Sequence, residues 1–323
     1  MNLGIIITAR CNASCEHCSK SYGPNRTEKL GRAEIFRLMD EAAAIDDGLP
    51  LKYDITGGEP FLDFGLLVEI VSHGARLGGV VTCVTNAFWA RTNELARSKL
   101  VLLRDSGLKS LSVSVSRFHQ RYVPLHRARR ALENAMDLGI STELKGAITM
   151  RDLAPGGALS EWESCLNADG INIFPVLPHL RQAATLPDDE YYREAGLPEH
   201  KCPAEEVCID FNGIARSCCG PGVSTGDFLV IGNANRTSVD EINQYLRRSG
   251  KHRILREVGP IGFARAAIAA GIGDSLRASY AGPCDLCMHI RTDPHLRQVA
   301  EDMGHAAEEG DSMASILAGS IPV

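Results

Sequence analysis

Three cysteines near the start of the chain have a spacing that suits metal chemistry. Cys11, Cys15 and Cys18 are separated by three and then two residues, directly after the apolar run of residues 3–8. At this spacing all three thiols can converge on one soft metal centre. A structural zinc or iron–sulfur site normally recruits a fourth thiolate, whereas three leave one position open for a substrate or cofactor. Taken alone, the motif also permits a zinc site or a chance match.

A second motif follows at the end of the next apolar run, residues 51–56. It reads Gly57-Gly58-Glu59-Pro60. The two glycines allow close approach of the backbone to a ligand, Glu59 supplies an acceptor for an ammonium group, and Pro60 ends the strand. A plain strand-to-helix turn is the alternative interpretation of this motif alone.

The elements that must position these motifs alternate between short apolar runs and longer amphipathic ones over the first 175 residues. This alternation predicts repeated βα units and a parallel sheet. The predicted strands are residues 3–8, 51–56, 80–85, 110–115, 142–149 and 170–175. The predicted helices are residues 32–45, 62–77, 92–106, 125–138 and 159–168. Parallel strands place their following loops on one face, so we expect both motifs to meet there.

Together the two motifs resemble the cluster loop and the GGEP motif of the radical S-adenosylmethionine (radical SAM) superfamily. The resemblance implies that Cys11, Cys15 and Cys18 hold a 4Fe-4S cluster and that Glu59 reads the amino group of SAM. It also implies reductive cleavage of SAM to a 5′-deoxyadenosyl radical and a flavodoxin- or ferredoxin-type electron donor. Residue 17, usually aromatic or apolar in the family, is His17 here.

Weaker matches on the same face complete the predicted cofactor site. The pair Thr85-Asn86 resembles the Thr-Asn-Gly of family members, with Ala87 in place of the glycine. Ser112, Ser114 and Ser116 alternate along one strand, so their hydroxyls point to one side and could contact the SAM carboxylate or ribose. Lys145 could pair with the SAM carboxylate, with an exposed or structural lysine as the alternative. The predicted cofactor-binding residues are His17, Gly57, Gly58, Glu59, Pro60, Asn86, Ser114, Ser116 and Lys145.

The cysteines return in the second half of the chain. Ten residues separate Cys202 from Gly213 and four separate Gly213 from Cys218, a spacing that resembles the opening of SPASM and twitch extensions of radical SAM enzymes. Residues 209–217 are predicted to form a β-hairpin with an Asn-Gly turn. The resemblance implies one auxiliary iron–sulfur cluster, and the same four ligands also permit a zinc ribbon. The four predicted ligands are Cys202, Cys218, Cys284 and Cys287.

The remaining cysteines receive other roles. Cys208 and Cys219 are candidate catalytic residues, because an S–H bond is weak enough to quench a substrate radical; a ligand or a buried bystander is the alternative. Cys83 and Cys165 are expected to be buried small hydrophobes. Eleven cysteines without an export signal favour metal ligation or redox chemistry over a disulfide framework.

The predicted fold class is therefore α/β, a partial (β/α)6 TIM-type barrel with a small C-terminal iron–sulfur domain. The expected divisions are a barrel over residues 1–180, a linker over 181–200, a twitch- or SPASM-like domain over 201–290 and a polar helical tail over 291–323. The formal net charge of −6 argues against a nucleic-acid partner. The sequence has no apolar run long enough to span a membrane and no secretory leader, so we expect a cytoplasmic protein without a membrane partner.

Two functions are compatible with these motifs. The first is modification of a ribosomally made peptide by cross-linking, thioether formation or epimerisation. Because the first strand begins at residue 3, leaving no room for an N-terminal leader-binding module, we expect recognition by a separate protein or by the barrel mouth. The second is oxidation of a small-molecule alcohol such as a sugar or cyclitol. A non-catalytic cluster-binding protein is disfavoured by the open ligand position at the Cys11–Cys18 loop and by Glu59.

Overall fold

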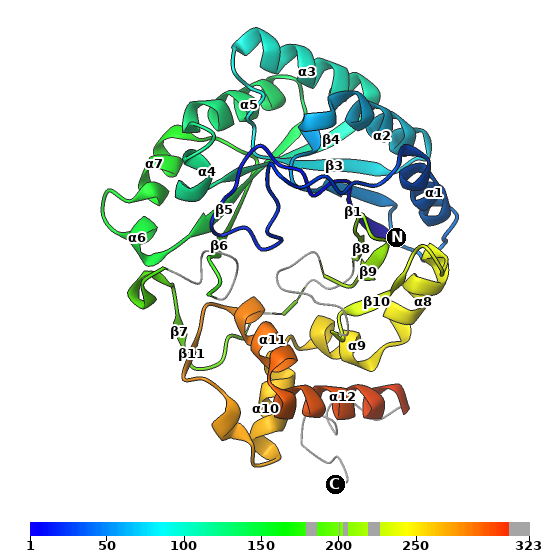
Figure 1. The fold of residues 1–323 in the computed structure, drawn as a ribbon, viewed down its shortest axis with the longest axis vertical. Coiled ribbons are helices and arrows are strands. Elements are labelled where there is room, and N and C mark those ends of the chain that lie inside the picture. The colour runs from blue at the N-terminus through cyan, green and yellow to red at the C-terminus, as the bar shows by residue number, and fades with distance from the viewer. Residues whose placement is uncertain (179–185, 200, 203–205, 219–226, 310–323) are drawn as a thin grey trace.

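A curved, mostly parallel sheet runs through the computed structural model (Figure 1). The structure describes residues 1–178, 186–199, 201–202, 206–218 and 227–309. The strand order is β10-β9-β8-β1-β2-β3-β4-β5-β6, and every neighbouring pair from β8 to β6 is parallel. The first six strands are β1 (Asn2–Ile6), β2 (Lys52–Thr56), β3 (Val80–Thr85), β4 (Leu108–Val115), β5 (Ser141–Ile148) and β6 (Gly170–Pro175). All six predicted strands form, and the partial-barrel fold class is confirmed.

Helices cover the convex face of the sheet. They are α1 (Arg32–Ala43), α2 (Phe64–Arg76), α3 (Asn93–Ser106), α5 (Leu125–Asp137) and α7 (Ala158–Cys165), with the short α4 (Arg117–Gln120) and α6 (Met150–Leu153) between them (Figure 1). Because side chains alternate along a strand, every second residue faces these helices. Tyr53 is fully buried there, and its hydroxyl donates to Met39 O at 2.7 Å. Gly107 and Gly139, which follow α3 and α5, both have positive φ, at 108° and 72°, as helix-ending glycines commonly do.

The predicted Asn-Gly hairpin forms, but it extends the main sheet. Strands β8 (Val207–Ile209) and β9 (Ile214–Arg216) pair antiparallel around Gly213, whose φ is 75°. Strand β8 also pairs in parallel with β1, which places Cys208 beside Gly4, and β10 (Val230–Asn233) continues the sheet from β9. Residues 201–290 thus contribute three strands to the nine-stranded sheet. The edge of β1 was open to this pairing because β1 has no other neighbour on that side.

Four helices pack together opposite the convex-face helices, beneath the open side of the curve (Figure 1). They are α9 (Gly250–Glu257), α10 (Ile261–Ala269), α11 (Pro283–Thr292) and α12 (Pro294–Glu309), preceded by α8 (Val239–Arg248). Helix α12 lies in the stretch expected to be a polar helical tail. Helix α12 buries Leu296, Ala300 and Met303 in the same apolar cluster as Leu255 and Leu286, because these residues recur on one helical face.

A short two-stranded sheet joins the segment that follows the barrel to the C-terminal region. Strand β7 (Glu194–Ala195) pairs antiparallel with β11 (Ser279–Tyr280). The stretch expected to be a linker therefore contributes a strand as well as the 3-10 helix Asp188–Glu190. The division of the chain into domains at residues 180, 200 and 290 stays a prediction.

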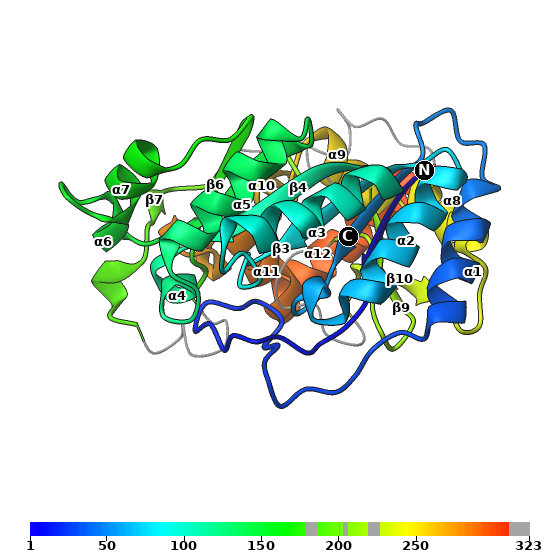
Figure 2. The same ribbon diagram turned by 90° about the horizontal axis from the view of Figure 1, so that it is seen from above.

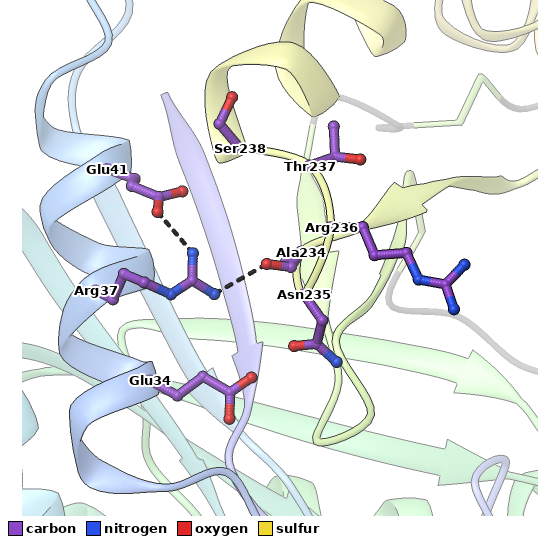
Figure 3. Close-up of a pocket in the computed structure, with 8 residues that line it drawn as sticks. All are labelled: Glu34, Arg37, Glu41, Ala234, Asn235, Arg236, Thr237 and Ser238. Carbon is purple, nitrogen blue, oxygen red and sulfur yellow. Dashed lines mark hydrogen bonds and ion pairs between the residues drawn. The ribbon is translucent and has the colours of Figure 1, made fainter.

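An open polar groove marks where the added strands meet helix α1 (Figure 3). Its walls come from α1 and from the segment between β10 and α8. Arg37 bridges them, donating to Glu41 Oε1 at 2.6 Å and to Ala234 O at 2.9 Å. Glu41 in turn accepts from the backbone N–H of Val239 at 3.0 Å. The groove therefore fastens the C-terminal region to the barrel, and it contains none of the predicted site residues.

Among the residues that the structure describes, none of the helices has both the length and the apolar character needed to cross a membrane.

Candidate active site

The cysteine loop and the Gly-Gly-Glu-Pro loop meet at the carboxyl ends of β1 and β2. The backbone N–H of Gly58 donates to Thr8 O at 2.6 Å, and that of Glu59 donates to Arg10 O at 2.9 Å. These bonds continue the pairing of β1 with β2 beyond the strands themselves. Figure 2 shows the long loop after β1, in dark blue, lying along one side of the barrel. The predicted meeting of the two motifs on one face is therefore observed.

The two glycines are needed for this approach. A Cβ atom at Gly58 would lie 2.2 Å from Arg10 O, and one at Gly57 would lie 2.7 Å from Thr8 O. Both distances are far below van der Waals contact, so any side chain would push the loops apart. Pro60 opens the 3-10 helix Pro60–Asp63 that leads into α2.

Glu59 is fastened inside the protein by three donors. Its Oε1 accepts from Thr85 Oγ1 at 2.8 Å and from the backbone N–H of Phe61 at 3.1 Å, while Oε2 accepts from the backbone N–H of Asn86 at 2.8 Å. Burial raises the pKa of Glu59 to about 7, and the three donors limit that rise. The carboxylate thus joins β2 to β3. Its predicted role toward the SAM amino group stays a prediction.

Asn86 connects the third strand to the cysteine loop. Its side-chain Nδ2 donates to Asn12 Oδ1 at 2.9 Å and to Cys11 Sγ at 3.8 Å. The next residue, Ala87, has a left-handed φ of 61°. A glycine adopts that conformation without strain, which explains why Thr-Asn-Gly is the sequence expected at this turn.

The thiols of the cysteine loop form a compact group. Cys11, Cys15 and Cys18 pack in one cluster, and the backbone N–H of Cys18 donates to Cys15 O at 3.1 Å. Burial raises the pKa of Cys11 to about 12, while the N–H of Ala13, which donates to Cys11 Sγ at 3.4 Å, acts in the opposite direction. Three thiols beside amide donors fit a cationic metal cluster, since metal binding replaces the thiol protons.

His17 stacks on Phe118 and meets His119 edge-on. Its ring centroid is 4.9 Å from that of Phe118 and 4.7 Å from that of His119. Burial lowers the pKa of His17, so its ring is neutral at pH 7. Its Nδ1 is buried without a hydrogen-bond partner in the described structure. This flat, neutral ring beside the cysteines suits contact with another planar group.

The three alternating serines have different surroundings. Ser116 is fully buried, and its hydroxyl caps α4 by accepting from the N–H of His119 at 3.1 Å. Ser112 donates to Glu143 Oε2 at 2.6 Å, and Ser114, which is half-buried, lies next to Lys145 in the register of β4 and β5. The Lys145 ammonium is 3.3 Å from Glu143 Oε2. Ser114 and Lys145 therefore share a polar concave face, whereas Ser116 has a capping role in the structure.

The sequence analysis missed an acidic pair on this concave face. Asp54 accepts from Thr82 Oγ1 and lies 2.8 Å from the Lys52 ammonium. Glu206 packs beside it, where a Cβ at Gly4 would be 2.4 Å from Glu206 Oε1. Burial and the negative charge of Asp54 both raise the pKa of Glu206. The alternation of Lys52, Asp54 and Thr56 was the available signal; nothing local indicates Glu206.

Cys208 is buried close to the cysteine loop. It is 1% exposed and belongs to the same apolar cluster as Cys11 and Cys15. This position follows from the pairing of β8 with β1, which the sequence analysis did not predict. Cys219, the other catalytic candidate, lies outside the described residues.

The four predicted auxiliary ligands line one cavity of about 60 Å³. Cys202, Cys218, Cys284 and Cys287 share its walls with apolar residues and with Lys201 and Arg291. Burial raises the pKa of Cys287, and it raises that of Cys284 to about 11. Among the described residues, no three His, Cys, Asp or Glu side chains are arranged to hold a single metal ion. The cavity brings four cysteines to one place, and this ligand set suits either an iron–sulfur cluster or a zinc ion.

The nine cysteines whose side chains are described form no disulfide. Cys83 is fully buried on the helix-covered face of β3, as expected for a small hydrophobic residue. The side chain of Cys165 lies outside the described part of the chain.

The fold and the site define a class of protein: a parallel partial barrel that carries a three-thiol loop and a glycine-rich loop at the carboxyl ends of its first strands. Residues 5–150 match the sequence profile of the Radical SAM superfamily. This part of the chain is a radical SAM domain, and the protein is an enzyme whose cofactors are a 4Fe-4S cluster and SAM.

Two curated relatives illustrate the range of similarity. The chain is 23% identical over 227 residues to the "Putative peptide biosynthesis protein YydG" of Bacillus subtilis (strain 168), covering 68% of this chain and 70% of the relative. It is 31% identical over 142 residues to the GTP 3′,8-cyclase of Sulfurimonas denitrificans, covering 42% of this chain and 40% of that enzyme. The chain thus spans less than half of the cyclase.

The fold also resembles a solved structure, described as native anSMEcpe with bound AdoMet. The TM-score is 0.55 with 10% sequence identity, and the match covers 96% of this chain and 99% of the other. At this identity the likeness concerns the fold alone.

Proposed function

We propose that this radical SAM enzyme acts on a ribosomally synthesised peptide, abstracting a hydrogen atom from one of its C–H bonds. The observation that carries the radical chemistry is the pair of backbone hydrogen bonds that join the Gly58–Glu59 loop to Thr8 and Arg10. The similarity to YydG, which extends over 70% of that protein, supports a peptide substrate.

The two motif loops and their neighbours would hold the cluster and SAM. Cys11, Cys15 and Cys18 would hold the cluster, and Gly57 with Gly58 would let the backbone approach SAM closely. Asn86 and His17 would orient the bound cofactor beside the thiols. When bound and reduced, the cluster and SAM would supply the radical chemistry that abstracts hydrogen. The fully buried side chains around Cys11 and Cys15 exclude water from a site where a radical would otherwise be quenched.

Substrate would lie on the polar concave face, where Ser114 and Lys145 offer a hydroxyl and an ammonium group. Glu143 and Asp54 offer acceptors on the same face. A peptide backbone has both donors and acceptors, so it can pair with groups of both kinds.

Cys208 is the candidate hydrogen donor to the substrate radical. In this step the S–H bond breaks and a C–H bond forms, leaving a thiyl radical. One electron from the reduced donor protein and one proton then restore the thiol. The burial of Cys208 in the same cluster as Cys11 and Cys15 supports this role, because donor and abstracting centre must face one substrate atom. Epimerisation is the peptide modification that such a donor favours.

We further propose that Cys202, Cys218, Cys284 and Cys287 hold one auxiliary iron–sulfur cluster. The single cavity that all four line supports this assignment. A separate peptide-recognition protein and a flavodoxin- or ferredoxin-type electron donor are the proposed partners.

Oxidation of a small-molecule alcohol, such as a sugar or cyclitol, is the second candidate. It is favoured by the density of charged groups on the concave face, where Lys52, Asp54, Glu143 and Lys145 could bind several hydroxyls. In that reaction the auxiliary cluster would accept the second electron.

The test uses anaerobically reconstituted protein with dithionite, SAM and a short peptide encoded beside its gene. We expect 5′-deoxyadenosine and a modified peptide, and neither product from Cys15→Ala. Equal 5′-deoxyadenosine release by both proteins would overturn the radical chemistry. Turnover of a cyclitol or sugar, with the peptide unchanged, would favour the second candidate.

A further inference from the structure

A buried positive charge lies in the wall of the four-cysteine cavity. Arg291 lines this cavity, and its side chain is 3% exposed. Burying a guanidinium costs free energy unless a negative partner compensates it. Asp227 supplies that partner, while the guanidinium still borders the cavity.

The sequence places Arg291 on the cysteine face of α11. Cys284, Cys287 and Arg291 are three and four residues apart, so their side chains lie along one side of the helix. The guanidinium and these two cysteines therefore border the same cavity.

Asp227 holds the guanidinium in place. Its Oδ2 is 3.1 Å from Arg291 Nε, and its own side chain is 5% exposed. The other carboxylate oxygen, Oδ1, accepts from the backbone N–H of Leu229 at 3.0 Å. Leu229 O accepts in turn from the N–H of Ser217, beside Cys218. The ion pair is thus tied to the strand end that carries a second cavity thiol.

The other cation at the cavity differs in its environment. Lys201 is exposed, so water and salt screen its charge, whereas Arg291 is buried and its charge is offset only by the carboxylate of Asp227. The two residues therefore allow a comparison between a solvent-screened charge and a buried charge at one site.

A four-thiolate iron–sulfur cluster carries net negative charge in both redox states, and reduction adds one more electron. A nearby buried cation favours the more negative, reduced state. We propose that Arg291, positioned by Asp227, raises the reduction potential of the cluster held by Cys202, Cys218, Cys284 and Cys287. This inference rests on the proposed auxiliary cluster.

The test isolates the auxiliary site by changing Cys11, Cys15 and Cys18 to Ala in every protein. The reduction potential is then measured by a titration monitored by electron paramagnetic resonance, with iron and sulfide counted per chain. We expect Arg291→Gln to shift the potential downward, Arg291→Lys to restore most of the shift, and Lys201→Gln to shift it less, with an effect that fades at high salt.

The direction of the shift in reduction potential distinguishes the loss of the Arg291 charge from damage to the cavity. A loosened cavity admits water, which stabilises the more charged reduced state and moves the potential upward. Asp227→Asn, which removes a negative charge and leaves Arg291 in place, is also expected to move it upward. A downward shift in Arg291→Gln alone therefore supports the charge effect.

Two outcomes count against the proposal and are distinguishable. No iron in the parent protein lacking Cys11, Cys15 and Cys18 would overturn the auxiliary cluster itself. Iron in the parent, together with an unchanged or higher potential in Arg291→Gln, would overturn only the role of Arg291. If Arg291→Gln loses its iron, Asp227→Asn decides: a potential equal to that of the parent in this variant would likewise overturn the role of Arg291.

Discussion

The backbone N–H of Asn86 donates to Glu59 Oε2 at 2.8 Å, which joins the end of β3 to the loop after β2. Because Asn86 also donates to the Cys11 sulfur, this pair connects three loops at the candidate active site. The arrangement of these three loops therefore depends on the carboxylate of Glu59, a residue that is 1% exposed.

Glu59→Gln is expected to destabilise the protein by about 1–3 kcal/mol, because an amide presents an N–H where the carboxylate accepts. The pH dependence of stability should also change. Burial raises the pKa of Glu59 from 4.5 to about 7, so between these values the unfolded state loses its proton first. Stability of the wild type should then fall by about 3 kcal/mol as the pH rises through that window.

Urea unfolding of the apo-proteins at pH 5 and pH 8 measures both effects. Glu206 titrates in both proteins, so its contribution cancels in the difference. The stability advantage of the wild type over Glu59→Gln should be larger at pH 5. Parallel pH dependences in the two proteins would contradict the prediction.

Gly58→Ala should separate the two loops, since its Cβ would lie 2.2 Å from Arg10 O. We expect a loss of stability of about 1–3 kcal/mol, as for other overpacked sites, and a large fall in SAM cleavage. Gly65→Ala is the matched control: Gly65 is exposed in the first turn of α2 and a Cβ there meets nothing within 4 Å. That change should leave SAM cleavage intact and stabilise the helix by up to about 1 kcal/mol. Thermal midpoints and 5′-deoxyadenosine release would show whether the two variants differ.

Asn86→Asp replaces an amide donor beside Cys11 with a negative charge. The carboxylate would repel the thiolate, so less iron should bind at the cysteine loop. Asn134→Asp is the control, because Asn134 is also buried and its Nδ2 donates to Asn93 Oδ1 at 2.7 Å, within the α3–α5 contact. Both changes should lower the thermal midpoint, but only Asn86→Asp should reduce the iron content. Normal iron in Asn86→Asp would show that the contact with Cys11 is unimportant for loading.

Cys208→Ala should preserve SAM cleavage and change the fate of the substrate radical. A thiol proton exchanges with solvent, so a peptide processed in D2O should carry one deuterium at the modified carbon, and Cys208→Ala should abolish this label. Cys83→Ala deletes an equally buried thiol on the opposite, helix-covered face and should retain it. Mass spectrometry of the peptide measures the outcome. If the Cys208→Ala enzyme still placed one deuterium on the peptide, Cys208 would not be the hydrogen donor and Cys219 would remain the candidate.

Most of the barrel was predictable because its patterns are local. The runs at residues 80–85 and 170–175 coincide with β3 and β6, and the predicted helices end within a few residues of those observed. The same holds for the two motif loops. Their place after β1 and β2 follows from the common direction of parallel strands, so their meeting did not require knowledge of distant contacts.

The rest depends on pairings between distant segments. The Asn-Gly turn specifies the β8–β9 hairpin locally, but nothing in residues 207–209 indicates β1 as the partner. The positions of Cys208 and Glu206 follow from that pairing, so neither neighbourhood could be predicted. The contacts of Glu59 with Thr85 and Asn86 were equally hidden, because they depend on the end of β3 and the turn after it, whereas Phe61 donates locally from two residues further along the chain.

The pairing of β8 with β1 joins the two halves of the chain in one sheet. A fragment ending near residue 200 would leave β1 with an unsatisfied row of backbone donors and acceptors and would uncover Leu3 and Ile5, which are fully buried. Such a fragment should self-associate through its bare strand. In this chain, the strands of the C-terminal region complete the sheet of the barrel.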